Sequence, residues 1–143
     1  MTTKIVLGEK EYFKGIGKIP FEGKESNNPL AFKFYDENRI IAGKSMSDHF
    51  RFAVAYWHTF CGNGADPFGP GTKEFPWSVN SEPVQAAEDK LDAAFEFITK
   101  LGVPFYCFHD RDMAPEGNSI SESDTILKNI VKLAKEKQMS SGV

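Results

Sequence analysis

The sequence lacks the features that mark secreted, membrane and nucleic-acid-binding proteins. Only two cysteines, Cys61 and Cys107, occur in 143 residues, which is too few for a disulfide framework and favours a reduced, cytoplasmic setting. The first ten residues hold no continuous apolar stretch that would serve as a signal, and no run approaches a membrane span. The 17 basic and 20 acidic residues form no basic block, which argues against nucleic acid or an anionic membrane as a partner.

The composition that is present favours a folded domain with a sheet. Hydrophobic residues make up 41% of the chain, enough to bury a sizeable core. Aromatic residues make up 13%, and most of them are Phe, which suits a sheet whose mouth binds a ligand better than a small helical bundle. The length fits one ordinary domain or a piece of a larger one.

Residues 1–45 are expected to form an extended arm. Glycine and proline recur along this charged segment. Short apolar stretches such as 30–32 would pack it against another part of the protein. We do not expect the arm to fold alone, and we place the main folded part at residues 46–143.

The main part contains two successive strand–loop–helix units, of which the first is the less clear. A helical turn at about 46–50 precedes a buried strand at about 51–57, and one continuous helix through Trp57 is the competing interpretation. The loop at 61–77 is rich in glycine and proline yet retains three large aromatic residues, which is more typical of a functional loop than of a connector.

The second unit is marked more clearly. A helix is predicted to begin at a Ser81 cap, to carry an apolar stripe along one face and to end at Gly102. A short run rich in β-forming residues at 103–108 predicts a buried parallel strand. After a loop at 109–121, a second helix is expected from about 121 to 137.

This alternation of strands and helices predicts an α/β fold with a parallel sheet. Two strands are too few for a stable sheet that is covered on both faces. A third strand would be expected after the second helix, where the sequence reaches Val143. We therefore expect the chain to be a shortened part of a larger α/β domain.

The strongest chemical signal is the segment FHDRD at 108–112, directly after the second predicted strand. Sites in α/β folds are built at the carboxyl ends of parallel strands. A carboxylate three residues after a histidine accepts the ring N–H, fixes the tautomer and stabilises the protonated ring. His109 and Asp112 are therefore a candidate catalytic pair for proton transfer to or from a substrate oxygen. A loop histidine bonded to a local aspartate, without chemistry, is at least as good an interpretation of these residues alone.

Metal binding is the other interpretation of this segment. His109, Asp110 and Asp112 are three potential ligands in four positions. However, no further acidic or histidine cluster lies at the end of another predicted strand, and the other histidines, His49 and His58, precede the first loop. A complete metal site within the chain is therefore not expected.

Two aromatic residues near the first loop are candidates for substrate binding. An aromatic face at the mouth of a barrel stacks on the apolar face of a ligand and keeps water from a reacting centre. Trp57, at the end of the first predicted strand, fits a core position equally well. Phe68 lies in a loop rich in glycine and proline, and for this residue binding is the better interpretation.

Taken together, these segments resemble the xylose isomerases, in the longer-chain form with an extra amino-terminal arm. No single motif is decisive, but the ordered set is highly specific and runs from about residue 20 to the last helix. It consists of FEGK at 21–24, NPLAF at 28–32, RFAVAYWHTF at 51–60, GADPFG at 64–69, YCFHDRD at 106–112 and APEG at 114–117.

The resemblance implies that the chain provides the first two βα units of a (β/α)₈ TIM barrel, preceded by the arm. It implies an aldose–ketose isomerase that interconverts the pentoses D-xylose and D-xylulose, and D-glucose with D-fructose. It further implies a homotetramer and two divalent cations, Mg²⁺, Mn²⁺ or Co²⁺. In this family the cation ligands and a substrate-contacting lysine lie on later strands, outside this chain, so we expect the chain alone to be inactive.

By the same resemblance, His109 matches the histidine that assists ring opening at the ring oxygen and anomeric hydroxyl of the sugar. Asp112 matches the carboxylate that orients it. Trp57 matches the aromatic wall of the sugar pocket, and Phe68 matches an aromatic residue that reaches into the pocket of a neighbouring subunit. Ring opening is followed by a hydride shift between C2 and C1.

Two other functions stay open from the sequence. One is a non-catalytic, truncated binding or assembly module that docks on full-length partners through its arm. The other is a metal-dependent phosphodiester nuclease that uses His109 and Asp112 as ligands. The excess of acidic over basic residues and the candidate substrate-binding aromatic residues argue against a nuclease.

Overall fold

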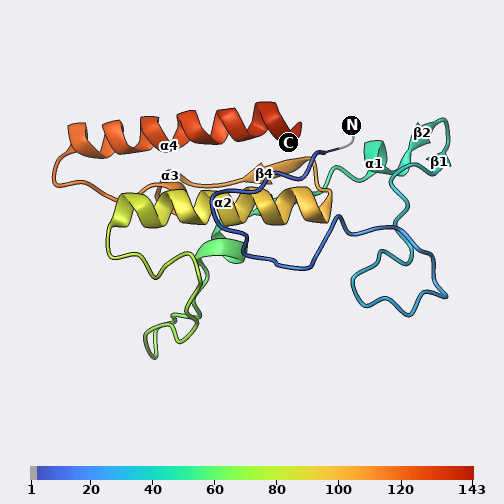
Figure 1. Ribbon diagram of the computed structural model, residues 1–143, viewed down its shortest axis with the longest axis horizontal. Helices are drawn as coiled ribbons and strands as arrows, with labels where there is room; N and C mark the ends of the chain where they lie inside the picture. The colour runs from blue at the N-terminus through green and yellow to red at the C-terminus, as the bar shows by residue number, and fades with distance from the viewer. Residues whose placement is uncertain (1–2) are drawn as a thin grey trace.

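Two parallel strands and the helices that follow them form the centre of the structure, a computed structural model that describes residues 3–143 (Figure 1). The strand β3 (Ala53–Ala55) pairs in parallel with β4 (Phe105–Cys107). The parallel pairing predicted from the sequence is confirmed. Each strand is shorter than expected, because only three residues of each predicted run, 51–57 and 103–108, join the ladder.

The helix α2 (Pro83–Leu101) connects these two strands. Its N-cap is Glu82 rather than the predicted Ser81, and Pro83 occupies the first helical position, where the N–H that proline lacks would have no intrahelical partner. The helix ends at Gly102 as predicted, since this residue has a φ of 78°, in the left-handed region that favours glycine.

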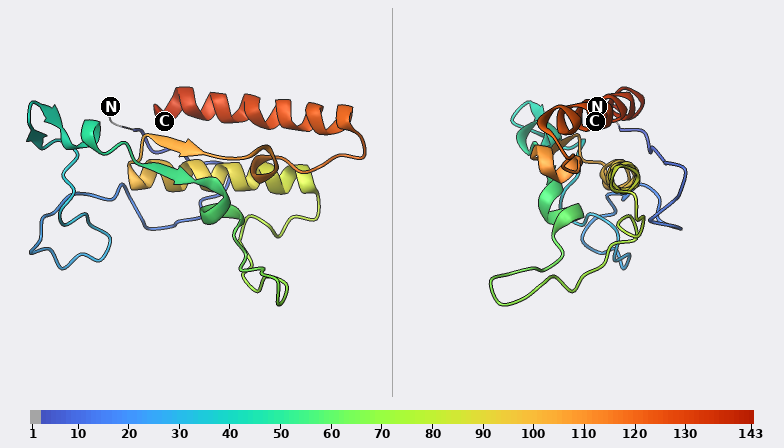
Figure 2. Two further views of the ribbon diagram at one scale, coloured as in Figure 1. Left: turned by 180° about the vertical axis from the view of Figure 1, so that it is seen from behind. Right: turned by 90° about the vertical axis from the view of Figure 1, so that its left-hand side faces the viewer.

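The second long helix, α4 (Ile120–Ser141), runs beside α2, and Figures 1 and 2 show the two helices side by side. Its N-cap Ser119 accepts a hydrogen bond from the backbone N–H of Glu122 at 3.1 Å. The helix is longer than the predicted 121–137, since it begins one residue earlier, at Ile120, and continues through Ser141. No helix within residues 3–143 is both long and apolar enough to cross a membrane.

One face of the strand pair is covered and the other is open. Val54 is buried in the core, and the ring of Tyr106 packs edge-on against Phe95 of α2 with 5.4 Å between centroids. Their strand neighbours Ala53 and Phe105 are exposed. Because successive side chains of a strand point to opposite faces, the exposed residues lie on the face that the helices leave uncovered.

The segment around β3 follows the first interpretation of the sequence, a helical turn and then a strand, but the strand ends earlier than predicted. A helical turn, α1 (Met46–His49), is present as predicted and is capped by Ser45. The strand ends at Ala55, and Trp57 begins a π-helical turn, η1 (Trp57–Cys61), so Trp57 does not end the strand and no continuous helix forms. This turn brings two large side chains into the core, where the ring centroids of Tyr56 and Phe60 lie 5.0 Å apart.

The predicted loop at 109–121 contains one further helical turn, α3 (Asp110–Met113). It forms because Met113 is fully buried in the core and the chain must turn sharply after β4 to place it there. The long loop between η1 and α2 is present as predicted and extends away from the helices (Figure 2).

The arm contains a small hairpin but otherwise little regular structure. β1 (Ile40–Ile41) and β2 (Lys44–Ser45) pair antiparallel around a turn in which Ala42 and Gly43 both have positive φ, as a two-residue hairpin requires. Earlier in the arm, residues 3–19 run along the two long helices. The Val6 N–H donates to Thr99 Oγ1 at 3.2 Å, and the Ile19 N–H donates to the Lys100 carbonyl at 2.7 Å.

A buried ionic cluster fastens this part of the arm to α2. The fully buried carboxylate of Glu96 accepts hydrogen bonds from the backbone N–H groups of Tyr12 and Phe13 and from Lys100 Nζ, at 2.8, 2.9 and 2.7 Å. Lys100 Nζ also donates to Glu11 Oε1 at 2.9 Å. Burial alone would raise the pKa of Glu96, but these hydrogen bonds outweigh it and lower that pKa below its ordinary value. Both residues lie off the apolar stripe of the helix, and the sequence did not predict the burial of Glu96 and Lys100.

Candidate active site

The backbone after β4 brings the carboxylate of Asp112 back to His109. His109 is extended, with φ −103° and ψ 160°, and the chain then turns into α3, so that the Asp112 N–H donates to the His109 carbonyl at 3.1 Å. One carboxylate oxygen, Asp112 Oδ2, accepts the His109 backbone N–H at 2.7 Å and lies 3.0 Å from the ring nitrogen Nδ1. The structure therefore holds the two residues in the orientation that the spacing predicted.

This contact determines which ring nitrogen is available for proton transfer. An ionised carboxylate can only accept, so we assign the proton of the neutral imidazole to Nδ1. Nε2 then carries the lone pair. The His109 side chain is 69% exposed, whereas that of Asp112 is 13% exposed, so a ligand can reach the imidazole while the carboxylate behind it is shielded. The pair has the geometry of a general base with an orienting group.

Trp57 forms a wall beside the imidazole. The ring centroids of Trp57 and His109 lie 4.7 Å apart at an interplanar angle of 44°. The turn η1 produces this position, because it swings Trp57 out of the strand while Tyr56 and Phe60 enter the core. Trp57 is only partly buried, which argues against the interpretation of this residue as simply a core side chain.

Phe68 lies apart from this group, at the tip of the long loop. Asp66 Oδ1 accepts the backbone N–H of Phe68 at 2.8 Å and of Gly69 at 3.1 Å, which holds the tip in a tight turn. The Phe68 side chain is 97% exposed, so within residues 3–143 it packs against nothing, including the other three candidates. The loop is not uniformly exposed, since Phe75 and Trp77 return to the core.

Three residues behind Asp112 were not predicted as part of the site. The thiol of Cys61 donates to the Asp112 backbone carbonyl at 3.5 Å, and Lys90 Nζ lies 3.6 Å from the sulfur. Burial raises the pKa of Cys61, and the positive charge of Lys90 offsets only part of that shift. The hydroxyl of Tyr56 is buried without a partner in the described part of the chain, and burial raises its pKa well above the ordinary value. No local motif marks these residues, because the fold and not the spacing brings them together.

The described residues do not fit a complete metal centre. Within residues 3–143 no three His, Cys, Asp or Glu side chains lie close enough together to hold a metal ion. Asp112 is engaged by His109, and Asp110 Oδ1 accepts the backbone N–H of Arg111 at 2.8 Å.

Cys61 and Cys107 are both free thiols, and they are differently placed. Cys107 is the last residue of β4. Cys61 is the last residue of η1, where it is half-buried.

Comparison with known proteins shows which proteins the chain is similar to. No family model matches the chain. All 143 residues align with Xylose isomerase 1 of Xanthomonas campestris pv. campestris (strain 8004) at 61% identity, and with Xylose isomerase 2 of the same strain at 60%. A xylose isomerase of Xanthomonas oryzae pv. oryzae (strain MAFF 311018) is 59% identical over the same length. The chain spans 32% of the length of each of these relatives.

The matched part is the amino-terminal portion of these proteins, and the likeness covers the whole of this chain. The resemblance found from the ordered motifs is thus confirmed: the chain is similar, from end to end, to the amino-terminal portion of xylose isomerases.

Proposed function

We propose that this chain acts as the amino-terminal portion of a xylose isomerase, an enzyme that interconverts D-xylose and D-xylulose, and D-glucose with D-fructose. Residues 1–45 form its arm, and residues 46–143 form the first two βα units of a TIM barrel. The end-to-end likeness to xylose isomerases supports this, as does the parallel pairing of β3 and β4. The uncovered face of the two strands is also consistent with a barrel whose remaining strands belong to polypeptide outside this chain.

The observation that carries the proposal is the contact between Asp112 Oδ2 and His109 Nδ1 at 3.0 Å, beside the ring of Trp57. His109 Nε2 takes the proton of the anomeric hydroxyl as the bond between C1 and the ring oxygen breaks. The same nitrogen then delivers a proton to the ring oxygen, which gives the open-chain aldehyde and a hydroxyl. Asp112 stabilises the transient imidazolium and keeps the ring in place. Trp57 covers the apolar face of the sugar.

The chain supplies only the ring-opening part of this reaction. The hydride shift between C2 and C1 relies on the two divalent cations, Mg²⁺, Mn²⁺ or Co²⁺, whose ligands belong to polypeptide outside this chain. In the homotetramer that we propose, Phe68 reaches into the pocket of a neighbouring subunit, which accounts for its 97% exposure here. The cytoplasmic setting expected from the low cysteine content stays a prediction.

The test uses a complementing polypeptide, defined as the part of Xylose isomerase 1 of Xanthomonas campestris pv. campestris that this chain does not match. We expect D-xylulose to form from D-xylose with Mg²⁺ or Co²⁺ only when the chain and the complementing polypeptide are mixed. His109→Ala should lower this turnover by about 10²- to 10⁴-fold, the range that general acid–base catalysis contributes.

The matched control is His49→Ala, which removes the ring that contacts the Ile41 carbonyl at 2.8 Å, in the hairpin region. This variant should leave turnover unchanged. Equal turnover by the His109→Ala and unsubstituted mixtures would contradict the assignment of His109.

A non-catalytic binding or assembly module is the second candidate. The exposed tip of the long loop favours it, since an aromatic side chain with 97% exposure is suited to contact with a partner. This candidate predicts that the folded mixture associates and yet forms no D-xylulose.

A further inference from the structure

Cys61 joins the turn η1 to the short helix α3. Its thiol donates to the backbone carbonyl of Asp112 at 3.5 Å. A thiol donates a hydrogen bond only while it is protonated, and burial raises the pKa of Cys61, so the S–H is present at neutral pH. The contact ties the turn that begins with Trp57 to the helix that contains Asp112.

The other polar groups of Asp112 bond to His109. The Asp112 N–H donates to the His109 carbonyl, and the carboxylate accepts the backbone N–H of His109 and faces Nδ1 of its ring. These bonds orient the two residues toward each other, but they do not attach the pair to the aromatic wall formed by Trp57. Cys61 makes that attachment, because it is the last residue of the same five-residue turn that Trp57 begins.

Lys90 of α2 contacts both ends of this turn. Its Nζ donates to Cys61 Sγ at 3.6 Å and lies 5.9 Å from the centroid of the Tyr56 ring, which directly precedes Trp57. Within residues 3–143 Lys90 forms no ion pair with a carboxylate. Because Lys90 donates to the sulfur, the thiol proton is left to donate to the Asp112 carbonyl.

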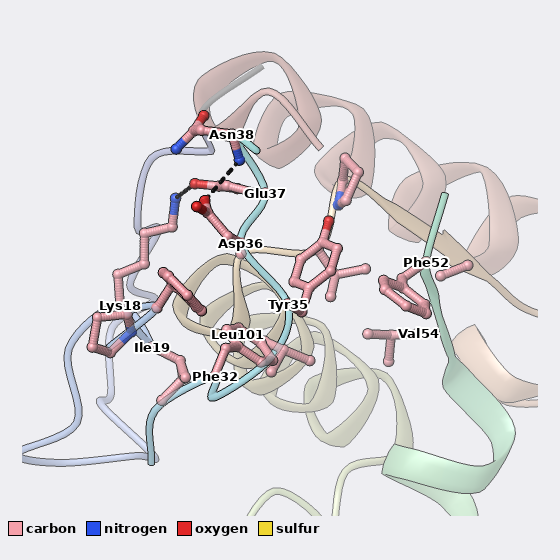
Figure 3. Close-up of a pocket in the computed structure, with 16 residues that line it drawn as sticks. Lys18, Ile19, Phe32, Tyr35, Asp36, Glu37, Asn38, Phe52, Val54 and Leu101 are labelled. Carbon is pink, nitrogen blue, oxygen red and sulfur yellow. Dashed lines mark hydrogen bonds and ion pairs between the residues drawn. The ribbon is translucent and has the colours of Figure 1, made fainter. Parts of the chain in front are cut away.

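Cys61 and Lys90 do not belong to the cavity of about 680 Å³ that lies between the arm, β3 and the end of α2. Figure 3 shows the side chains that line this cavity, among them Tyr35 and Phe52, and neither Cys61, Lys90 nor Asp112 is one of them. Cys61 is half-buried and bonds to the backbone of Asp112, whereas the imidazole is the exposed part of the catalytic pair. An effect of Cys61 on a bound sugar would therefore act through Asp112.

We propose that Cys61 and Lys90 are positioning residues for the pair of His109 and Asp112. Lys90 orients Cys61, and Cys61 fixes the Asp112 peptide against η1, so that the carboxylate stays on His109 Nδ1 and the lone pair stays on Nε2. Without this attachment the carboxylate loses its fixed place, and the proton is shared between both ring nitrogens. These roles rest on the proposed function, because they assist ring opening, but the tautomer of His109 is measurable without any sugar.

The experiment measures the ratio of the Nδ1–H to the Nε2–H tautomer of His109 by heteronuclear NMR of the full chain, at about pH 8, where an ordinary imidazole is neutral. Cys61→Ala should lower this ratio by about twofold or more, the factor that corresponds to about 0.5 kcal/mol, the lower end for one hydrogen bond. Cys61→Ser keeps a donor and should give a ratio between the other two. Lys90→Met removes the donor to sulfur and should also lower the ratio.

The matched control is Cys107→Ala, because Cys107 is the other free thiol and bonds to the Val54 carbonyl at 3.8 Å rather than to α3. This variant should leave the tautomer ratio unchanged, although Cys107 is closer to His109 in the sequence. Far-ultraviolet circular dichroism checks that each variant is folded, and Lys90→Met provides the test if Cys61→Ala does not fold.

Turnover connects the tautomer to the reaction. In the mixture with the complementing polypeptide, Cys61→Ala should lower the turnover of D-xylose by about the same factor as the tautomer ratio. The positioning roles would be overturned by an unchanged ratio in the folded variants of Cys61 and Lys90, by an equal fall in Cys107→Ala, or by a lowered ratio with unchanged turnover. A mixture of the unsubstituted chain that forms no D-xylulose would instead contradict the proposed function, whatever the tautomer ratios are.

Discussion

Replacing Glu96 with Gln removes one negative charge from the buried junction between the arm and α2 and leaves the shape of the side chain unchanged. The carboxylate accepts hydrogen bonds from Tyr12 N–H, Phe13 N–H and Lys100 Nζ, with donor–acceptor distances of 2.9 Å or less. Removing one partner of a buried ion pair costs about 3–5 kcal/mol, because the other charge is left buried. Lys100 keeps its bond to Glu11, so we expect the lower end, a loss of about 3 kcal/mol in the free energy of unfolding.

Urea denaturation at neutral pH, followed by far-ultraviolet circular dichroism, measures this loss. The control is Asp124→Asn, which breaks an exposed pair with Lys128 that has the same i,i+4 spacing and an oxygen–nitrogen distance of 2.6 Å. Exposed pairs contribute about 0.3–0.5 kcal/mol. Glu96→Gln combined with Lys100→Met should lose less than Glu96→Gln alone, because no buried charge remains. The reasoning is refuted if Glu96→Gln destabilises the chain no more than Asp124→Asn.

Two further predictions follow from the pKa shifts and from exposure. Folding lowers the pKa of Glu96, so its contribution to stability is present above the unfolded pKa of about 4.3 and is lost as pH falls through the folded pKa. Urea titrations across the acid range should therefore show a smaller loss of stability on acidification for Glu96→Gln, and equal losses would contradict the assignment. For the thiols, the exposed Cys107 should react with a disulfide reagent before the half-buried Cys61, whose pKa is raised by burial. Mass spectrometry of the partly labelled chain shows the order, and first labelling at Cys61 would be inconsistent with its environment.

The parts of the fold that the sequence predicted are those set by local chemistry. Gly102 ends α2 because a left-handed residue is needed there, and the apolar run before His109 forms a parallel strand. The orientation of His109 by Asp112 was also predictable, since a three-residue spacing places the carboxylate one turn away. The roles of these two residues in catalysis, and those of Trp57 and Phe68, stay predictions.

The parts that were missed depend on tertiary contacts. The turn η1 forms because Tyr56 and Phe60 both enter the core, and a short apolar run carries no periodicity that would reveal this. From the sequence, Glu96 and Lys100 would be expected on the surface of an amphipathic helix. They are buried because the arm lies over them. The contact of Cys61 with Asp112 joins residues 51 positions apart, which no local spacing indicates.

The role of His109 in ring opening is tested most directly by comparing a cyclic substrate with one that has no ring to open. D-Glyceraldehyde has too few carbons to form a sugar ring, whereas D-xylose is mostly cyclic. In the mixture of the chain with the complementing polypeptide, His109→Ala should lower the isomerisation of D-xylose by about 10²-fold or more and leave that of D-glyceraldehyde nearly unchanged. Equal losses for both substrates, or no loss for D-xylose, would contradict the assignment of His109 to ring opening.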